Sequence, residues 1–399
     1  IKMGPTLLVF AVAAVLTGSF LAGRARAMMV SGGDSRKLHS LPAYHGWSAL
    51  LAFAVPACTV WFVFFGLLPA QGLPALGFLG IVGAGAAGLF VLLITTRGDT
   101  RARNRVEALI KAALIGCSVI AIATTLGIIL SLVFETNEFF RQYQWTNFFF
   151  GTVWRPDFRG NSDLGFLPLL WGTLYVSAIA LAVAVPIGLF AAIYMSEYAS
   201  SRLRSVAKPL IELLAGIPTI VYGLFALITV GPLLRDWIAS PLGFGQSGAS
   251  VMTAGLVMGV MIIPFVSSLS DDIINAVPQS LRDGSLGLGA TQSETIRNVV
   301  LPAALPGIVG AILLAASRAI GETMIVVLGA GAAAKLSLNP FEAMTTMTVK
   351  IVSQLTGDTD FAAPETLVAF ALGLTLFVLT LCLNIVALYI VRKYREQYE

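Results

Sequence analysis

The stretch AALPGIVGAILLAASRAIGETMIVVLGAGAA, residues 303–333, is long and apolar enough to cross a bilayer as a helix. It nevertheless carries Arg318 and Glu322, two charges four residues apart within SRAIGETMIVV (317–327). By membrane-insertion scales, each such charge costs roughly 2.5–3.5 kcal/mol at the centre of a spanning helix. We therefore expect the charged side of this segment to face a bundle interior or a pore, and not lipid.

Composition places the rest of the chain in a membrane as well. Of the 399 residues, 57% are hydrophobic and 12% are charged, whereas soluble domains average about 25% charged residues. About nine apolar runs predict an all-α polytopic membrane protein, because a barrel strand needs only about 9–11 alternating residues. The expected transmembrane helices are 5–23, 47–69, 74–95, 106–134, 168–195, 209–234, 250–268, 303–333 and 366–391.

Positive charge predicts which loops face the cytoplasm. Basic residues cluster after the first run, before the fourth, after the fifth and at the C-terminus. This pattern places the N-terminus outside, the C-terminus inside and the polar loop 269–302 in the cytoplasm. A change of composition at TTRGDTRARNR (95–105) divides the chain into a three-helix N-terminal extension, residues 1–96, and a six-helix core, residues 97–399. The run 5–23 also resembles a signal peptide, but it lacks a cleavage site ahead of a soluble domain, which favours a retained helix.

Loop 269–302 has the pattern of two short helices around a glycine turn. Apolar and small residues recur at helical spacing before two glycines that end the first helix. A capping box then starts a second short helix toward Val300, which Leu301–Pro302 closes. Such a unit offers a docking surface for a partner protein, although an ordinary interfacial loop fits the pattern equally well. The residues that carry the pattern are Leu281, Ser285, Leu288, Gly287, Gly289, Thr291 and Glu294.

The same loop resembles the cytoplasmic signature of permease subunits of bacterial ABC importers. That signature has Glu-Ala-Ala, then three intervening residues and a Gly, then nine intervening residues and Ile-x-Leu-Pro. The spacing is kept here, but the leading triplet is Asp-Gly-Ser. In the family this loop forms a coupling helix that sits in a groove of the ATPase subunit, so the resemblance implies that role for residues 272–290. The matching positions are Asp283, Gly284, Ser285, Gly289, Val299, Leu301 and Pro302.

Three further segments resemble core helices of permeases of the PstC type from phosphate importers. They are YMSEYAS (194–200), IELLAGIPTIVYGLFAL (211–227) and SRAIGETMIVVLGAG (317–331), and the likeness extends over about residues 106–399. The resemblance implies a multi-pass permease of the bacterial inner (plasma) membrane that moves inorganic phosphate from periplasm to cytoplasm. It also implies three protein partners besides membrane lipid, and no nucleic acid. These partners are a separate ATPase subunit, a second homologous permease subunit in a heterodimer, and a periplasmic phosphate-binding protein.

Arg318 and Glu322 are the candidate residues of the substrate pathway. Residues four apart on a helix are about 40° apart around its axis, so both side chains should face the same way. A guanidinium donates two parallel hydrogen bonds to a tetrahedral oxyanion. A carboxylate that restrains it accepts a hydrogen bond from monohydrogen phosphate but repels sulfate, which has no proton. The neighbouring hydroxyls of Ser317 and Thr323 belong to the same candidate pathway, and a buried ion pair that only locks two helices remains the alternative.

The AGIPT stretch (215–219) predicts a break in another expected helix. Pro218 removes a backbone hydrogen bond and Gly216 lets the chain bend. A broken membrane helix can point free N–H groups at an anion, and Thr219 and Tyr222 add hydroxyls nearby. A proline kink that only shapes packing is an equally good reading.

Several chemical functions are not expected. The chain has no Gly-x-x-x-x-Gly-Lys-Ser/Thr loop and no nucleophile–base constellation, so we expect a transport subunit and not an enzyme. His39 and His45 lack companions at ligand spacing, so we expect neither a metal site nor a cofactor. Alternatives are a permease for sulfate, molybdate or phosphonate, a secondary transporter with a proton relay at Arg318 and Glu322, and a membrane sensor. A docking helix is unnecessary in a secondary transporter.

Overall fold

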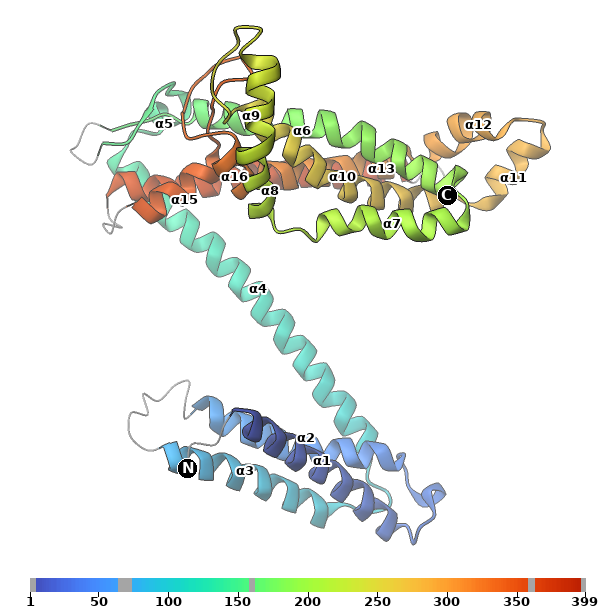
Figure 1. Cartoon of the computed structure of the whole chain (residues 1–399). Helices are drawn as coiled ribbons and strands as arrows, with labels where there is room; N and C mark the ends of the chain where they lie inside the picture. The colour runs from blue at the N-terminus through green and yellow to red at the C-terminus, as the bar shows by residue number, and fades with distance from the viewer. Residues whose placement is uncertain (1–4, 64–73, 158–161, 358–362, 396–399) are drawn as a thin grey trace. The chain divides into compact units, whose positions relative to one another are not determined.

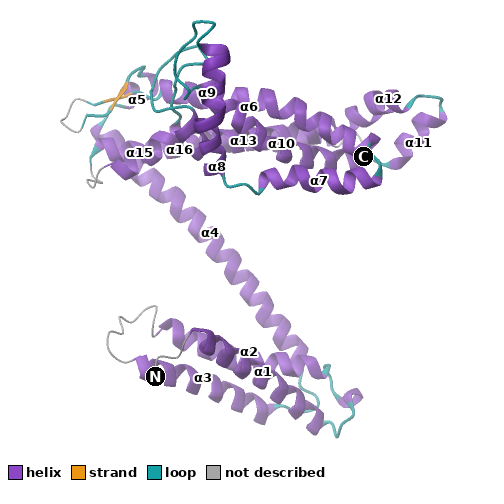
Figure 2. Cartoon of the chain, viewed as in Figure 1, coloured by secondary structure: helices purple, strands orange, loops and turns teal. Residues whose placement is uncertain are grey.

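The computed structural model describes the chain except for residues 1–4, 64–73, 158–161, 358–362 and 396–399 (Figure 1). The described part is almost entirely helical, with one short antiparallel strand pair (Figure 2). It divides into two compact units, residues 1–126 and 127–399, which we call unit 1 and unit 2. Helix α4, Ala102–Gln142, belongs to both.

Unit 1 is a bundle of apolar helices. It contains α1 (Pro5–Val30), the 3-10 turn η1 (Ser35–Lys37), α2 (Pro42–Trp61), α3 (Pro74–Thr95) and the first part of α4. Glycines bring the helix backbones together, because a Cβ atom on Gly88 would lie 2.1 Å from the carbonyl oxygen of Ala52. Close approach through small residues is the usual way in which membrane helices associate.

Unit 2 is a longer helical bundle with an aromatic cluster at one end. Its first elements after α4 are α5 (Trp145–Phe150), β1 (Trp154–Arg155), β2 (Asp163–Leu164), α6 (Leu167–Ile193), the π turn η3 (Tyr194–Tyr198) and α7 (Ser201–Ala215). The middle of the unit contains α8 (Thr219–Phe225), the π turn η4 (Ala226–Val230), α9 (Gly231–Leu234), the π turn η5 (Arg235–Ala239) and α10 (Val251–Asn275). The last elements are α11 (Gln279–Gly287), α12 (Gln292–Thr295), the π turn η6 (Ile296–Val300), α13 (Leu301–Ile320), α14 (Met324–Gly329), α15 (Met347–Gly357) and α16 (Pro364–Arg395). The strands pair Trp154 with Leu164.

Helix α10 forms the centre of unit 2 and packs along α6. Most of its length is buried, as expected for a helix that is apolar on all sides. Gly255 and Gly259 face α6, where a Cβ on Gly255 would lie 2.7 Å from the Cβ of Ile179. The core around this contact includes Val176 and Ala180 of α6 and Met258 of α10.

Six helices in the described part of the chain are long and apolar enough to span a membrane. They are 102–142, 167–198, 219–239, 251–275, 292–320 and 364–393. The predicted all-α polytopic class is therefore confirmed, whereas the count of nine spans stays a prediction.

The run 209–234 is interrupted after Ala215, as the AGIPT stretch (215–219) predicts. Two other expected element boundaries were wrong. The run 303–333 is interrupted after Ile320. Leu301–Pro302 does not close the second loop helix, since helix continues over 292–320. The wide π turn η6 directly before Leu301 accommodates Pro302, which has no backbone N–H to donate.

The close contact between α6 and α10 predicts the effect of a single methyl group. Gly255→Ala should lower the free energy of unfolding by about 1–3 kcal/mol, because the new Cβ overlaps Ile179. Thermal unfolding of the purified protein in detergent measures this. The matched control is Gly127→Ala on α4, where no atom lies within 4 Å of the new Cβ. Equal midpoints for the two variants would contradict the packing argument.

Candidate functional site

The loop with the predicted coupling role, called the coupling loop below, contains α11 and α12 at one end of unit 2 (Figure 1). Helix α11 ends at Gly287, and Gly289 turns the chain with a positive φ of 89°, a conformation that glycine adopts without strain. At the start of α12, the Thr291 hydroxyl and the Glu294 carboxylate form the predicted capping box. The Thr291 N–H donates to Glu294 Oε2 at 2.8 Å. The predicted helix–glycine turn–helix is confirmed.

The predicted coupling residues divide into two groups. Asp283 and Gly284 are exposed on α11, and the Ser285 hydroxyl lies 2.9 Å from the Thr295 hydroxyl, which joins α11 to the second helix. Leu301 and Pro302 instead lie in the first turn of α13. The same surface also presents apolar groups, since Leu281, Leu286 and Leu288 are exposed there, Leu288 by 91%.

Arg318 and Glu322 do not share a helix face, contrary to the sequence prediction. Helix α13 ends at Ile320 and Gly321 is its C-cap, so Glu322 lies beyond the helix. The Arg318 guanidinium is exposed and lies 5.8 Å from the centre of the Phe265 ring. In the part of the chain that the structure describes, it forms no ion pair.

Glu322 stabilises the start of α14. Its Oε1 accepts hydrogen bonds from the backbone N–H groups of Thr323, Met324 and Ile325 at 3.1, 3.0 and 3.4 Å. These N–H groups have no partner within the helix, and a carboxylate is favoured beside them. This is the physical reason for the interruption. The hydroxyl of Thr348 donates to the Glu322 carbonyl oxygen at 2.8 Å and holds the turn from α15.

The second interruption lies between α7 and α8. Gly216 is the C-cap of α7 and Pro218 is the N-cap of α8. The Tyr222 hydroxyl donates to the Leu214 carbonyl oxygen across the break at 2.8 Å, so this hydroxyl is already used within the chain. Thr219 is half-buried in the first turn of α8.

The helices that follow the two interruptions, α8 and α14, pack against each other. A Cβ on Gly223, in the middle of α8, would lie 2.8 Å from the carbonyl oxygen of Met324, the first residue of α14. Tyr222 and Ile325 belong to the same core cluster. The fold therefore brings together two segments that sequence reasoning had treated separately, and Ser317 is half-buried one turn before the α13 end.

Sequence reasoning missed several polar residues around these segments. Thr348 and Lys350 are on α15, and burial lowers the pKa of Lys350. Glu197, Arg282 and Asp271 form ion pairs at the coupling-loop end of unit 2. The sequence does show a charge at the end of an apolar run, which marks a residue worth considering. It does not identify the ion-pair partners of Glu197 and Asp271, because these lie far away in sequence.

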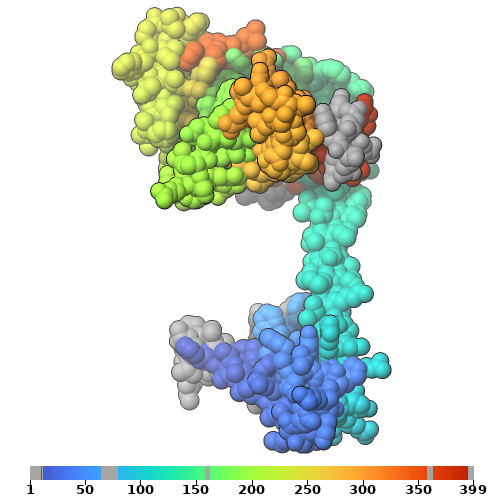
Figure 3. Space-filling view, turned by 90° about the vertical axis from the view of Figure 1, so that its right-hand side faces the viewer, coloured from blue at the N-terminus to red at the C-terminus, as the bar shows by residue number. Residues whose placement is uncertain are grey.

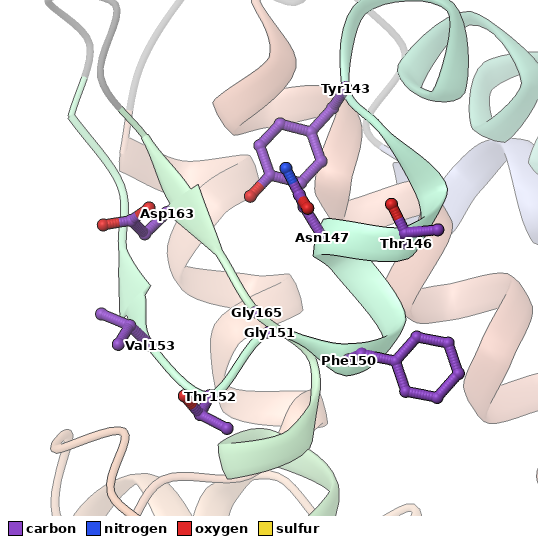
Figure 4. Close-up of a pocket in the computed structure, with 9 residues that line it drawn as sticks. All are labelled: Tyr143, Thr146, Asn147, Phe150, Gly151, Thr152, Val153, Asp163 and Gly165. Carbon is purple, nitrogen blue, oxygen red and sulfur yellow. The ribbon is translucent and has the colours of Figure 1, made fainter.

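A cavity of about 410 Å³ lies at the other end of unit 2, between α5 and the strand pair (Figure 4). Tyr143, Thr146 and Asn147 line it, and the Tyr143 hydroxyl accepts a hydrogen bond from the Leu164 N–H at 3.0 Å. Among the described residues that line it, Asp163 is the charged one.

The six long apolar helices and a family match together identify a membrane transport permease. Residues 184–396, more than half of the chain, match the family described as the binding-protein-dependent transport system inner membrane component. The chain belongs to this family and is a multi-pass protein of the inner membrane. Residues 9–84 match a second family, described as a phosphate ATP-binding cassette transporter.

Similar proteins agree with this assignment. The phosphate transport system permease protein PstC 1 of Mycobacterium tuberculosis is 38% identical over 248 residues, which cover 57% of this chain and 72% of the relative. The phosphate transport system permease protein PstC of Haemophilus influenzae is 30% identical over 305 residues, or 73% of this chain and 95% of the relative. A bacterial ABC transporter that imports alginate has a similar fold, with a TM-score of 0.50, 15% identity and coverage of 74% and 99%. The predicted resemblance to PstC-type permeases is confirmed.

The capping box predicts the local stability of the coupling loop. Thr291→Ala removes the hydroxyl that caps α12, which should cost about 1 kcal/mol. Hydrogen exchange of the backbone amides of residues 292–296 should become about fivefold faster, since 1.4 kcal/mol corresponds to a factor of ten. The matched control is Ser293→Ala in the same short helix. Unchanged exchange in Thr291→Ala would show that the loop does not depend on the box.

Proposed function

We propose that the protein is the membrane-spanning permease subunit of an ATP-driven importer that moves inorganic phosphate from the periplasm to the cytoplasm. The observation that carries this proposal is the likeness of the permease region to phosphate transport permeases, together with the phosphate-type match of residues 9–84. An exposed arginine in the last turn of α13, with no ion pair among the described residues, supplies the matching chemistry.

Arg318 attracts phosphate in transit. Its guanidinium has no carboxylate partner in the described residues, so its donors are available to an anion. It binds two oxygens of a tetrahedral oxyanion in parallel. The contact with the Phe265 ring is compatible with anion binding. A guanidinium over an aromatic face keeps its N–H donors available at the edge of the guanidinium plane.

Glu322 selects for a protonated anion. Only its Oε1 accepts the three backbone hydrogen bonds, so Oε2 is available for a substrate. Monohydrogen phosphate can donate a hydrogen bond to this oxygen, whereas sulfate cannot. Ser317, Thr323 and Thr219 contribute hydroxyls along the same path. In this proposal Glu322 holds the turn in place and no longer restrains Arg318.

Energy comes from a separate ATPase subunit that docks on α11 and α12. The chain contains no phosphate-binding loop of its own. A periplasmic phosphate-binding protein delivers the substrate, and a second homologous permease subunit completes the pathway. Within the described residues, the most apolar window of α4 has no buried residue, so in this proposal it contacts lipid or that subunit.

We also assign residues 1–96 to a membrane extension and residues 97–399 to the permease core. The boundary between the two compact units falls instead within α4, between residues 126 and 127. The difference arises because a composition change marks the end of a loop, whereas a single helix can belong to two packed units. The six described spans and the coupling loop fit an ATP-driven permease better than a secondary transporter.

Removal of the Arg318 charge provides the test of the function. In vesicles that contain the permease pair and the ATPase, ATP-dependent uptake of labelled phosphate should fall at least tenfold in Arg318→Gln. A hydrogen bond to a charged group is worth about 1.5–3 kcal/mol, and tenfold corresponds to about 1.4 kcal/mol. The matched control is Arg141→Gln on α4, an exposed arginine paired with Glu138. Uptake that does not depend on ATP would overturn the proposed function.

Glu322→Gln separates selectivity from structure. Glutamine keeps a side-chain oxygen that accepts the three N–H bonds, so the interruption should persist while the charge is lost. We expect unlabelled sulfate to compete about tenfold better with labelled phosphate uptake than it does in the parent protein. Glu342→Gln, which removes a carboxylate paired with Lys335, is the control. Unchanged competition by sulfate rules out the selectivity role.

A further inference from the structure

Glu197 attaches both coupling helices to the end of α6. Its carboxylate accepts a hydrogen bond from Arg282 Nη1 on α11, and its backbone carbonyl accepts one from Gln292 Nε2 on α12 at 2.6 Å. Arg282 Nη2 also donates to the Ile274 carbonyl oxygen of α10 at 2.7 Å. The side chains of Arg282 and Glu197 are only 13% and 9% exposed, so this pair is largely shielded from solvent.

Asp271 attaches α7 to α10. The Asp271 side chain is fully buried, and its two oxygens accept hydrogen bonds from Arg204 Nη2 at 3.0 and 2.9 Å. Lys208, one turn further along α7, donates to the same carboxylate at 2.8 Å. This hydrogen bond raises the pKa of Lys208. The ammonium group therefore stays charged at pH values above the ordinary pKa of a lysine. Helix α7 contains no fully buried residue, and these ion pairs attach it to α10.

Asn275 joins the two attachments. Its Nδ2 donates to the carbonyl oxygen and to Oδ1 of Asp271 at 2.6 and 3.0 Å. Its Oδ1 accepts a hydrogen bond from the hydroxyl of Ser196, the neighbour of Glu197, at 3.2 Å. A continuous polar chain therefore runs from α11 and α12 through the end of α6 to α7. Figure 3 shows the coupling helices (orange) beside the end of α6 and α7 (green).

Helix α7 leads directly to the helix interruptions. It ends at Ala215, and the Tyr222 hydroxyl reaches back to Leu214 across the break. Helix α8, beyond the break, packs against the start of α14, which Glu322 caps. A displacement of α7 is thus transmitted to the segment that carries the candidate substrate residues.

We propose that Glu197 and Asp271 are positioning residues that transmit movement of the coupling helices to α7 and the interruption at 216–218. Loss of one member of a buried ion pair leaves an uncompensated charge, which is strongly unfavourable. The network therefore moves as one body and does not separate. By contrast, the pair of Lys208 with Asp272 is solvent-exposed, with Asp272 66% exposed and 3.4 Å away, and contributes little.

The test compares two adjacent aspartates and rests on the proposed docking of an ATPase. In the reconstituted complex, Asp271→Asn should reduce the phosphate transported per ATP hydrolysed at least tenfold while hydrolysis persists. Asp272→Asn, the matched control, should leave this ratio unchanged. A parallel loss of uptake and hydrolysis in Asp271→Asn, or an unchanged ratio, would overturn the proposal.

A second measurement does not depend on the substrate. Ile217→Cys is introduced at the interruption after the three exposed cysteines, Cys58, Cys117 and Cys382, are replaced by serine. ATP should change the rate of maleimide labelling at least threefold in this protein, and Asp271→Asn should abolish the change. This outcome supports the inference even if the complex transports no phosphate, in which case only the proposed function fails. A nucleotide effect that survives Asp271→Asn contradicts the inference.

If the complex does not assemble with Asp271→Asn, the charges of Glu197 and Arg282 can be exchanged to test the same proposal. Glu197→Arg and Arg282→Glu, made singly, should each abolish the effect of ATP on labelling at position 217. The double variant restores opposite charges across the same contact and should recover at least half of the effect. If the single variants respond to ATP like the parent, or the double variant fails to recover, Glu197 has no positioning role.

Discussion

A bilayer offers no water to a free backbone N–H or carbonyl group, and the permease unit depends on how it satisfies this constraint where helices are interrupted. After α13, the Glu322 carboxylate accepts three N–H groups at the start of α14. After α7, the Tyr222 hydroxyl donates to a carbonyl at the helix end. Each interruption is thus completed by a side chain from its own segment, which makes irregular backbone possible at membrane depth.

The interruptions lie at the substrate site that we propose for this unit. Because α8 packs on the beginning of α14, two breaks from distant parts of the chain lie together, with Arg318 at the end of one of the broken helices. The cost of this charge is reduced by exposure and by the Phe265 ring, and not by a partner carboxylate. In the function that we propose, this exposed cation at the end of a broken helix attracts the anion.

Charge serves a different purpose at the coupling-loop end. There the carboxylates of Glu197 and Asp271 are buried and fully paired, whereas apolar packing holds the middle of the bundle. Buried ion pairs contribute little net stability but specify one geometry, because any displacement exposes an uncompensated charge. An attachment of this kind suits helices that must move together without separating.

Local features were predictable from the sequence by itself: the apolar runs, the capping box at Thr291, the glycine turn at Gly289 and the break at Pro218 each depend on residues within one or two helical turns. The end of α13 was not predictable, since a Glu four residues after an Arg fits a continuous helix equally well. Only the tertiary structure decided that Glu322 caps α14, that α8 lies against it, and that Asp271 pairs with Arg204, 67 residues away in sequence. The physical reason is that a charge buried in a membrane protein takes its partner from whichever helix packs beside it, and packing is set by the whole bundle.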